Sequence, residues 1–378
     1  MKIKPKLTIS DFFVDVTDPR IDRTKEHKLI DIITIAICAV ISGADTWVSI
    51  EAYGQAKFDW FKKFLSLPNG IPSHDTFARV FSRIDPQEFQ ESFLKWIQSV
   101  NNKTEGEVIS LDGKQLRHSY DRAGQKGAIT MVSAWASSQK LVLGQRKVNS
   151  KSNEITAMPE LIKMLELKGC LVTIDAMGCQ KATVKILSEK QADYVIAVKR
   201  NQKNLYRLIE NLFGQAIRSG CQGFLSSSYQ TRETSHGREE IRNYLMLSEI
   251  HEKVDPTHQW SNLQSIGMVE SVRTENGKTT VESRYFISSL PGDAKKFSDA
   301  VRTHWRIENN LHWVLDVAFC EDSSRIRQGN APQNFAVLRH IALNLLNQEK
   351  SDKIGIKTKR LKAGWSEDYL AQVVGLKI

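Results

Sequence analysis

The sequence of 378 residues predicts an α/β protein with a mixed sheet, preceded by an all-α region. Three observations support this fold class. Apolar residues recur at helical spacing through residues 1–103, and β-rich runs alternate with amphipathic helices between residues 107 and 218. A helical pattern then continues without a break from Asp293 to about Val317. We expect one of its faces to pack inward, with Glu308 in the middle of that face and Phe297, Val301, His304, Trp305, Leu311, His312 and Leu315 around it.

These patterns divide the chain into three parts. We expect a helical N-terminal domain at residues 1–103, which is a candidate for DNA binding. The polar run at residues 101–106 has the composition of a linker. A mixed-sheet domain follows at residues 104–348, with a β-rich insertion at about 219–290, and the chain ends in a basic tail at residues 349–378.

Composition and charge are those of a globular protein with an excess of basic residues. Hydrophobic residues make up 41% of the chain and charged residues 25%, which is ordinary for this class. The formal net charge is +10 and the pI is about 9.2. The excess favours an anionic partner, above all nucleic acid, although a solvated basic surface accounts for the charge equally well.

The five cysteines and the apolar segments exclude several classes of protein. The cysteines are odd in number and form no C-x-x-C pair, so neither a disulfide framework nor a zinc site is indicated. Cys38, Cys170 and Cys320 have apolar neighbours, and we expect buried thiols there. The N-terminus does not have the long apolar core of a signal peptide, and the apolar run at residues 29–43 is short for a membrane span and contains Asp31. We therefore expect a cytoplasmic protein with no membrane partner.

The N-terminal region contains several helix signals. Residues 29–45 are apolar nearly all round, as in a central helix. Ser73 is a good N-cap for a short helix that ends near residue 84, and Asp85 followed by Pro86 begins another helix. The short helix between tight turns is similar to the reading helix of a helix-turn-helix, but packing of three helices is just as consistent with a scaffold.

From residue 107 onward the pattern changes to that of a sheet with covering helices. The predicted strands are residues 107–114, 128–137, 140–148, 170–175 and 193–199, and the predicted helices are residues 155–167, 180–190, 203–218 and 331–347. The second and third strands form a hairpin, and the fourth has the nearly continuous apolar run of a buried parallel strand. Further β-like runs at 242–247, 264–273 and 279–290 predict the β-rich insertion.

Two aspartates stand at the C-terminal ends of predicted strands. Asp112 stands in the C-terminal part of the first strand and Asp175 is the last residue of the fourth, and open α/β sheets bind ligands beyond the carboxyl ends of their strands. If the two strands are neighbours, the two side chains lie side by side. Taken alone, each aspartate is more typical of a turn or a helix cap, and Glu308 is more typical of a salt-bridged acid.

Together the three acids predict a metal site. Converging carboxylates repel one another unless cations neutralise them, and Mg²⁺ or Mn²⁺ fits a set of oxygen ligands. Two such ions about 4 Å apart activate water or a 3′-hydroxyl and stabilise the leaving oxygen in phosphoryl transfer. In a basic protein this arrangement predicts the cutting or joining of nucleic-acid strands. Glycosidases also use paired carboxylates, but that chemistry does not account for the positive charge.

Three polar clusters fit contacts with the phosphates of DNA. One follows a predicted strand directly, and the others lie in the insertion and after the long helix. Their candidate residues are Lys199, Arg200 and Asn201, then His236, Arg238 and Arg242, then Arg325 and Arg327. Each cluster alone is also typical of a solvated loop.

Several long motifs point to a known family. They are HKLIDII (27–33), GIPSHDTFARVF (70–81), LDGK (111–114), KSNEITAMPELI (151–162), TIDAMGCQ (173–180), VKRNQ (198–202), SHGREEIR (235–242) and HWRIENNLHWVLDVAFCEDSSRIRQGNAP (304–332). Over nearly its whole length the chain resembles the H-repeat-associated, ISAs-type insertion-sequence transposases of bacteria. The last motif is long and specific.

This resemblance implies a DDE-type DNA transposase with a ribonuclease H-like catalytic core. Asp112, Asp175 and Glu308 are then the catalytic acids, and they hold two Mg²⁺ or Mn²⁺ ions. The implied partner is double-stranded DNA, both the terminal inverted repeats of an element and its target, and a homodimer on DNA brings the two ends together. The long gap before Glu308 matches a β-rich insertion in this family, and Lys114, in the first aspartate motif, is a further candidate for DNA contact.

The surroundings of the glutamate differ from the wider superfamily, which often has a tyrosine, an arginine and a lysine there. The equivalent positions are Val301, His304 and Leu315, so His304, Arg306 and His312 are candidates to contact DNA instead. A second hypothesis belongs to a different class. In it the chain is a degenerate, transposase-derived protein that still binds DNA but no longer catalyses, and the three acids are vestigial.

Overall fold

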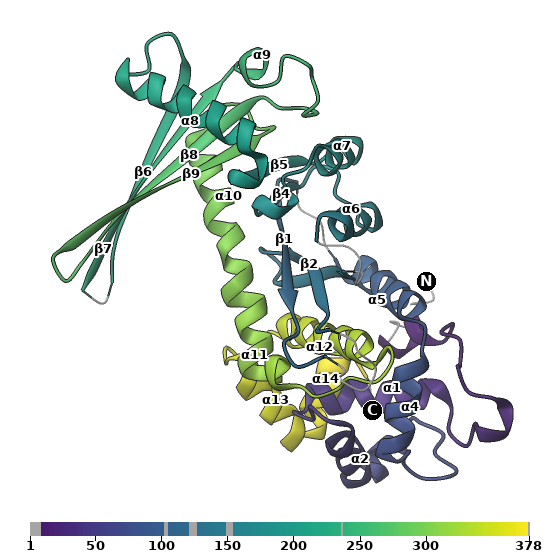
Figure 1. Ribbon diagram of the computed structural model, residues 1–378. Helices are drawn as coiled ribbons and strands as arrows, with labels where there is room; N and C mark the ends of the chain where they lie inside the picture. The colour runs from purple at the N-terminus through teal and green to yellow at the C-terminus, as the bar shows by residue number, and fades with distance from the viewer. Residues whose placement is uncertain (1–8, 102–104, 121–126, 149–153, 236, 377–378) are drawn as a thin grey trace, which may run out of the picture.

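The computed structural model describes residues 9–101, 105–120, 127–148, 154–235 and 237–376. Figure 1 shows a group of helices at one end, a sheet in the middle, and a ribbon of long strands that extends away from the sheet. One long helix, drawn in green, runs from the ribbon past the sheet to the group of helices.

The described residues form one mixed sheet. Its strands are β1 (Val108–Gln115), β2 (Thr130–Ala136), β3 (Leu141–Lys147), β4 (Leu171–Ile174), β5 (Asp193–Val198), β6 (Leu225–Ser235), β7 (Arg238–Ser248), β8 (Ser265–Glu275) and β9 (Lys278–Ser288). Their order is β3-β2-β1-β4-β5-β9-β8-β7-β6. β1 pairs antiparallel with β2 and parallel with β4, and β4 pairs parallel with β5. The predicted α/β class with a mixed, ribonuclease H-like core is therefore confirmed.

Helices cover both faces of this core. They are α6 (Glu154–Met164), α7 (Lys181–Glu189), α8 (Lys203–Arg218), α9 (His251–Val254), α10 (Ala294–Ile307), α11 (Trp313–Phe319) and α12 (Ala331–Gln348). Short 3₁₀ turns lie at Ile9–Phe13, Asp22–Thr24, Ala176–Gly178, Arg200–Gln202 and Glu321–Ser323. α6 packs on β2 and β3, whereas α10 packs on β1 and β4 from the other side (Figure 1).

The β-rich insertion continues the main sheet, because β9 pairs antiparallel with β5. Its four strands form the projecting ribbon (Figure 1). β7, β8 and β9 cover the three β-like runs of the sequence. β6 has no such signal, because nearly all of its side chains are exposed and polar and show no alternation with a buried face.

The N-terminal helices form where their sequence signals predict. They are α1 (Leu29–Ile41), α2 (Trp47–Ala56), α3 (Phe58–Phe61), α4 (His74–Arg83) and α5 (Pro86–Val100). α1 buries every side chain except Ile30, as expected of a central helix. The side chains of Ser73 and Asp85 accept backbone N–H groups at the starts of α4 and α5, so both predicted caps are confirmed. α12 packs against α1, α4 and α5, which joins the helical region to the sheet.

The basic C-terminal segment is two packed helices, α13 (Ile356–Trp365) and α14 (Glu367–Val374). Lys359 and Arg360 are buried. Arg360 donates to the backbone oxygen of Val40 at the end of α1 and pairs with Asp45 at 2.8 Å. A guanidinium group can donate hydrogen bonds to the carbonyl groups at the C-terminal end of a helix. These bonds offset the free-energy cost of burying its charge. The tail charges at these two positions therefore stabilise the fold.

Two of the three predicted buried thiols are confirmed, because Cys38 and Cys170 are buried. The prediction for Cys320 is wrong. Cys320 is exposed at the end of α11, where its backbone has a φ of 51° and leaves the apolar face of the helix. Among the described helices, none is both long and apolar enough to cross a membrane.

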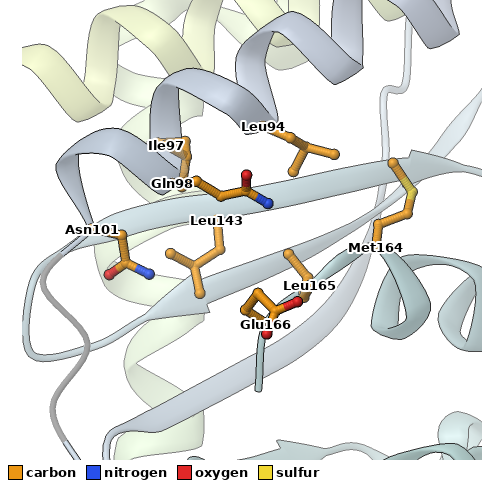
Figure 2. A pocket seen from close by; sticks show the side chains of 8 residues that line it. All are labelled: Leu94, Ile97, Gln98, Asn101, Leu143, Met164, Leu165 and Glu166. Atoms are coloured by element: carbon orange, nitrogen blue, oxygen red, sulfur yellow. The ribbon is translucent and has the colours of Figure 1, made fainter. Parts of the chain in front are cut away.

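A pocket of about 430 Å³ lies where the helical region meets the sheet (Figure 2). Its lining comes from α5, β3 and the end of α6 and consists of Leu94, Ile97, Gln98, Asn101, Leu143, Met164, Leu165 and Glu166. The lining contains none of the predicted site residues and is largely apolar. We therefore do not assign the chemistry of the acids to this pocket.

Candidate active site

The register of the sheet brings two of the predicted acids to one edge. Leu111 on β1 is the parallel partner of Ile174 on β4. Asp112 and Asp175 each follow these partners by one residue, so they lie at the same height on neighbouring strands. Because the strands are parallel, both carboxylates stand at the carboxyl edge, where open α/β sheets bind ligands.

The long helix is not α-helical throughout. Asp293 caps its start by accepting the backbone N–H of Lys296 at 2.9 Å. α10 then passes into a π-helical turn, Glu308–His312, which continues as α11. The regular helical pattern did not predict this turn. π-Turns are rare and recur at functional sites, and this one begins at the predicted glutamate.

The side chains of this segment are only partly oriented as predicted. Leu311, His312 and Leu315 are buried, as expected. Trp305 and Glu308 are exposed, so their predicted inward positions are wrong. The helix passes the open edge of the sheet here, and the wider turn displaces side chains from regular α-helical spacing. Glu308 can therefore reach an ion at the edge without the cost of burying its charge.

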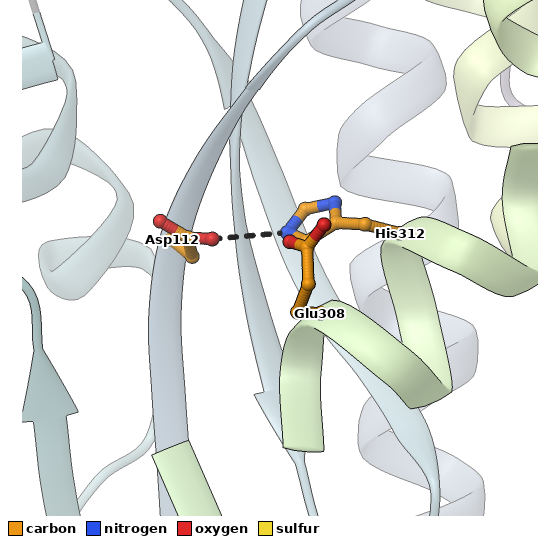
Figure 3. A group of neighbouring side chains, drawn as sticks. All are labelled: Asp112, Glu308 and His312. Atoms are coloured by element: carbon orange, nitrogen blue, oxygen red, sulfur yellow. Dashed lines mark ion pairs between the residues drawn. The ribbon is translucent and has the colours of Figure 1, made fainter. Parts of the chain in front are cut away.

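Asp112, Glu308 and His312 form a compact cluster (Figure 3). One ligand atom from each residue lies within 4.8 Å of the others. Nε2 of His312 is 3.2 Å from Oδ2 of Asp112. Two carboxylates and an imidazole suit a divalent cation, and two nearby negative charges favour its binding. The donor set therefore fits the predicted metal chemistry.

Asp175 lies beside this cluster and is not a member of it. Its Oδ1 accepts the backbone N–H of Met177 at 2.9 Å and caps the turn that follows β4. Asn201 holds the same turn by donating to the backbone oxygen of Ala176 at 2.6 Å. The VKRNQ motif therefore contributes a side chain that positions the loop after Asp175, a role that the sequence did not indicate.

Contacts between polar side chains join α10 to β1 and β4 near the acids. Oγ1 of Thr173 donates to Oγ of Ser110 at 3.1 Å and lies 3.0 Å from Nδ1 of His304. Burial lowers the pKa of His304, although the charges of Asp112 and Asp175 act in the opposite direction. His304 is therefore a neutral anchor between α10 and β4. We do not retain it as a DNA contact.

Lys114 has partners within the protein as well. It lies two residues after Asp112 on the same face of β1. Its ammonium group contacts Asp316 and lies 3.2 Å from Oε2 of Glu321, and its side chain is 14% exposed. We therefore assign Lys114 to the support of the site and no longer to DNA.

A fourth acid, Glu154 at the start of α6, was not singled out from the sequence. A Cβ atom on Gly113 would lie 2.5 Å from its Oε1, so the absence of a side chain at Gly113 makes room for this carboxylate. Burial raises the pKa of Glu154, and the charges of Asp175 and Asp112 raise it further. The only signal was its place in the KSNEIT motif.

The remaining basic candidates divide into paired and exposed side chains. Arg242 pairs with Glu240 at 2.9 Å and with Glu233 at 3.1 Å. Arg238 lies 3.9 Å from Glu240, and Arg327 donates to the backbone of His118 at 2.8 Å. The exposed candidates are Lys199, Arg200, Arg306 and Arg325. The candidate His236 lies outside the described residues.

Comparison with known proteins agrees with this architecture. Residues 103–345 match the family model described as "Transposase DDE domain", and residues 10–97 match the model described as "DDE_Tnp_1-associated". The chain belongs to the DDE transposase family. The matched ranges cover the sheet domain with its site and the N-terminal helices, respectively.

Relatives of this transposase match it over almost its whole length. It is 43% identical to "Putative transposase YncI" of Escherichia coli O157:H7, over 97% of this chain and 94% of that protein. It is also 43% identical to "H repeat-associated putative transposase YhhI" of Escherichia coli K12, over 92% of this chain and 93% of that protein. A shorter relative, "Inactive transposase YbfQ" of the same strain, is 53% identical over 15% of this chain and 68% of its own length.

Proposed function

We propose that this transposase cleaves DNA at the ends of an insertion sequence and joins the freed ends to target DNA. Asp112, Asp175 and Glu308 are the catalytic acids and hold two ions, Mg²⁺ or Mn²⁺. The observation that supports this proposal most directly is that Asp112 and Asp175 follow paired residues of the parallel strands β1 and β4, with Glu308 of the long helix beside Asp112.

The reaction has two steps, and both exchange one phosphodiester bond for another bond to phosphorus. Water attacks the phosphorus at the element end, the bond to the 3′-oxygen breaks, and a 3′-hydroxyl is released. That hydroxyl attacks a target phosphodiester, loses its proton, and displaces the 3′-oxygen of the target strand. When bound, the ions supply activation of the attacking oxygen and stabilisation of the leaving oxygen.

The protein itself positions the three acids. Asp112 is held in β1 opposite Ser133 of β2, and Asp175 is held by the turn that follows β4, whereas the exposed Glu308 keeps the freedom to turn toward a bound ion. The turn after Asp175 is held by Asn201, and the helix is held by the His304–Thr173 contact. These supports keep the ligands in place and reduce the ordering required when an ion binds.

DNA contacts come from the exposed basic side chains around this edge. We assign Lys199, Arg200, Arg306 and Arg325 to the phosphates. Trp305 adds an aromatic surface one turn before Glu308. It is 39% exposed, and the guanidinium carbon of Arg284, on β9, lies 4.6 Å from its ring. A partly exposed indole beside a cation suits contact with a nucleotide at the reactive end.

Cleavage by an acid variant tests the proposal. The substrate is a duplex containing the gene with its flanking DNA, incubated with Mg²⁺ or Mn²⁺. Asp112→Asn should lower cleavage by roughly 10³-fold or more and leave the Kd for DNA unchanged. Asp299→Asn is a matched control on α10, because Asp299 is an exposed acid paired with Lys295 at 3.4 Å. Full cleavage by Asp112→Asn contradicts the assignment.

The second candidate is a transposase-derived protein that binds DNA without catalysis. One relative, which matches 15% of this chain, is named an inactive transposase, and this name motivates the comparison. This alternative predicts no effect of Mn²⁺ on the surroundings of Asp112. Metal titration followed by paramagnetic broadening of nearby resonances distinguishes the two. A nuclease without strand transfer is a third reading, and joined DNA products exclude it.

The larger assembly belongs to the same proposal. We assign residues 1–103 to a helical domain that contributes to DNA binding, residues 104–348 to the catalytic domain, and residues 349–378 to a basic C-terminal segment. A homodimer brings two terminal inverted repeats together on the bacterial nucleoid. Sedimentation with end DNA, which should give two chains per pair of ends, measures this.

A further inference from the structure

His312 is a buried histidine without the partners that buried histidines usually have. Its side chain is 3% exposed. Within the described residues neither ring nitrogen makes a hydrogen bond, although Nε2 lies 3.2 Å from a carboxylate oxygen of Asp112. Buried polar groups are nearly always hydrogen-bonded, and each exception requires a physical reason.

Two ordinary roles do not fit this side chain. A structural histidine would be expected to satisfy at least one ring nitrogen, as His304 does with Thr173. A DNA contact requires access to solvent, which His312 does not have. Figure 3 shows its ring facing Asp112, with the carboxylate of Glu308 alongside. The orientation is that of a ligand toward a shared central point.

We propose that Nε2 of His312 is a ligand of the ion held by Asp112 and Glu308, and that this mixed nitrogen and oxygen site binds Mn²⁺ in preference to Mg²⁺. The inference rests on the proposed metal site and adds a ligand to it. Imidazole nitrogen favours first-row transition metals, whereas Mg²⁺ favours oxygen ligands throughout. Asp112 and Asp175, which offer only oxygen ligands, would hold the other ion.

The distances fit a site that closes slightly around an ion. Ligands on opposite sides of an ion at about 2.1 Å lie roughly 4.2 Å apart. The present upper limit of 4.8 Å is only a little larger. Glu308 is exposed and can turn to close the difference, while His312 and Asp112 are held by the helix and the strand.

The surroundings of His312 also fit the position of the ring proton that metal binding requires. A metal-bound Nε2 must have a free lone pair, so the proton resides on Nδ1, and such a proton normally has an acceptor. A pocket of about 10 Å³ is lined by His312, Gln145 and His340 among others, and the side-chain amide of Gln145 also has no hydrogen-bond partner among the described residues. This is about the room that one water needs to link these groups.

Pulsed electron paramagnetic resonance of the full chain loaded with Mn²⁺ alone tests the ligand directly. With ¹⁵N-labelled histidine, the wild type should show magnetic coupling between Mn²⁺ and a histidine nitrogen. His312→Asp, which retains an oxygen ligand, should bind Mn²⁺ and lose the coupling. His251→Gln, at an exposed histidine on α9, is the control and should retain it. Absence of coupling in the Mn²⁺-loaded wild type overturns the inference, as does coupling that survives His312→Asp.

Metal affinities distinguish a failure of this inference from a failure of the proposed function. The ratio of the Mg²⁺ to the Mn²⁺ dissociation constant should fall roughly tenfold in His312→Asp. An unchanged ratio contradicts the nitrogen ligand. If Mn²⁺ binding requires Asp112 but shows no histidine coupling, only the inference fails. If Mn²⁺ binding is the same in Asp112→Asn, the proposed metal site fails as well.

Discussion

The ammonium group of Lys114 contacts the carboxylate of Asp316 and so ties the strand that bears Asp112 to the helix that bears Glu308. The same ammonium group lies 3.4 Å from the backbone oxygen of His312 and 3.2 Å from Glu321. These contacts fix the end of the π-helical turn against β1. The distance between two of the proposed catalytic acids therefore depends on a lysine that pairs with neither of them.

Lys114→Met should weaken the site without removing a ligand. The change leaves Asp316 without its cation and Glu321 with Arg339 as its remaining cation, and the turn is then less firmly held. We expect the affinity for Mn²⁺ and the rate of cleavage to fall by roughly 10–100-fold, as for other residues that support metal ligands. Calorimetric titration with Mn²⁺ measures the affinity. Lys114→Arg restores the charge and should recover part of the loss, and normal affinity in Lys114→Met contradicts this role.

Gly267 sets how closely the ribbon packs on the long helix. A Cβ atom at this position would lie 2.7 Å from Cε2 of Phe297. Phe297 belongs to α10, and its ring is fully buried. Gly267→Ala should lower the free energy of unfolding by about 1–3 kcal/mol, because the ring has no room to move. Urea denaturation measures the change. In the double variant, the smaller leucine of Phe297→Leu should relieve part of this loss in the free energy of unfolding. Losses in the two single variants that simply add up in the double variant would contradict the contact.

Glu349 gives the fold a defined dependence on acid. Burial alone would raise the pKa of its carboxyl group, but hydrogen bonds from Ser351, Tyr369 and Lys359 outweigh burial and lower the pKa to about 2. The folded pKa is below the usual value of 4.5, so this stabilisation is complete above about pH 4.5 and is lost as the pH falls toward 2.

Glu349→Gln should therefore lower the free energy of unfolding at pH 7 by roughly 2–3 kcal/mol, with the difference from wild type shrinking between pH 4.5 and 2. Denaturant titrations at several pH values measure it. Asp22→Asn is the control, because Asp22 is almost fully exposed and its pair with Lys25 is screened by solvent. A pH-independent loss in Glu349→Gln contradicts the assigned cause.

The parts of the fold that were predicted from the sequence have local signals. Ser73 and Asp85 cap their helices through neighbouring backbone groups, and the apolar run of α1 is buried. The common edge of Asp112 and Asp175 required one further condition, that β1 and β4 are neighbours. Parallel pairing then puts their carboxyl ends together.

The errors concern features without a local signal. The partner of Lys114 is 202 residues away, and the partner of Arg360 on α1 is 320 residues away, so each basic residue read alone suggested an exposed charge. The π-helical turn at Glu308 adds a residue to a turn without a distinctive sequence. β6 is exposed on nearly every side chain and so has no periodic pattern.

The most direct test of the account is cleavage by Asp175→Asn in Mn²⁺, with DNA binding and folding measured on the same sample. Asp175 lies outside the cluster of Asp112, Glu308 and His312, yet we propose that it holds the ions equally with the other two acids. We predict a loss of cleavage of roughly 10³-fold or more, as for Asp112→Asn, with the Kd for end DNA unchanged. Cleavage by Asp175→Asn within a few-fold of wild type would contradict the three-acid site.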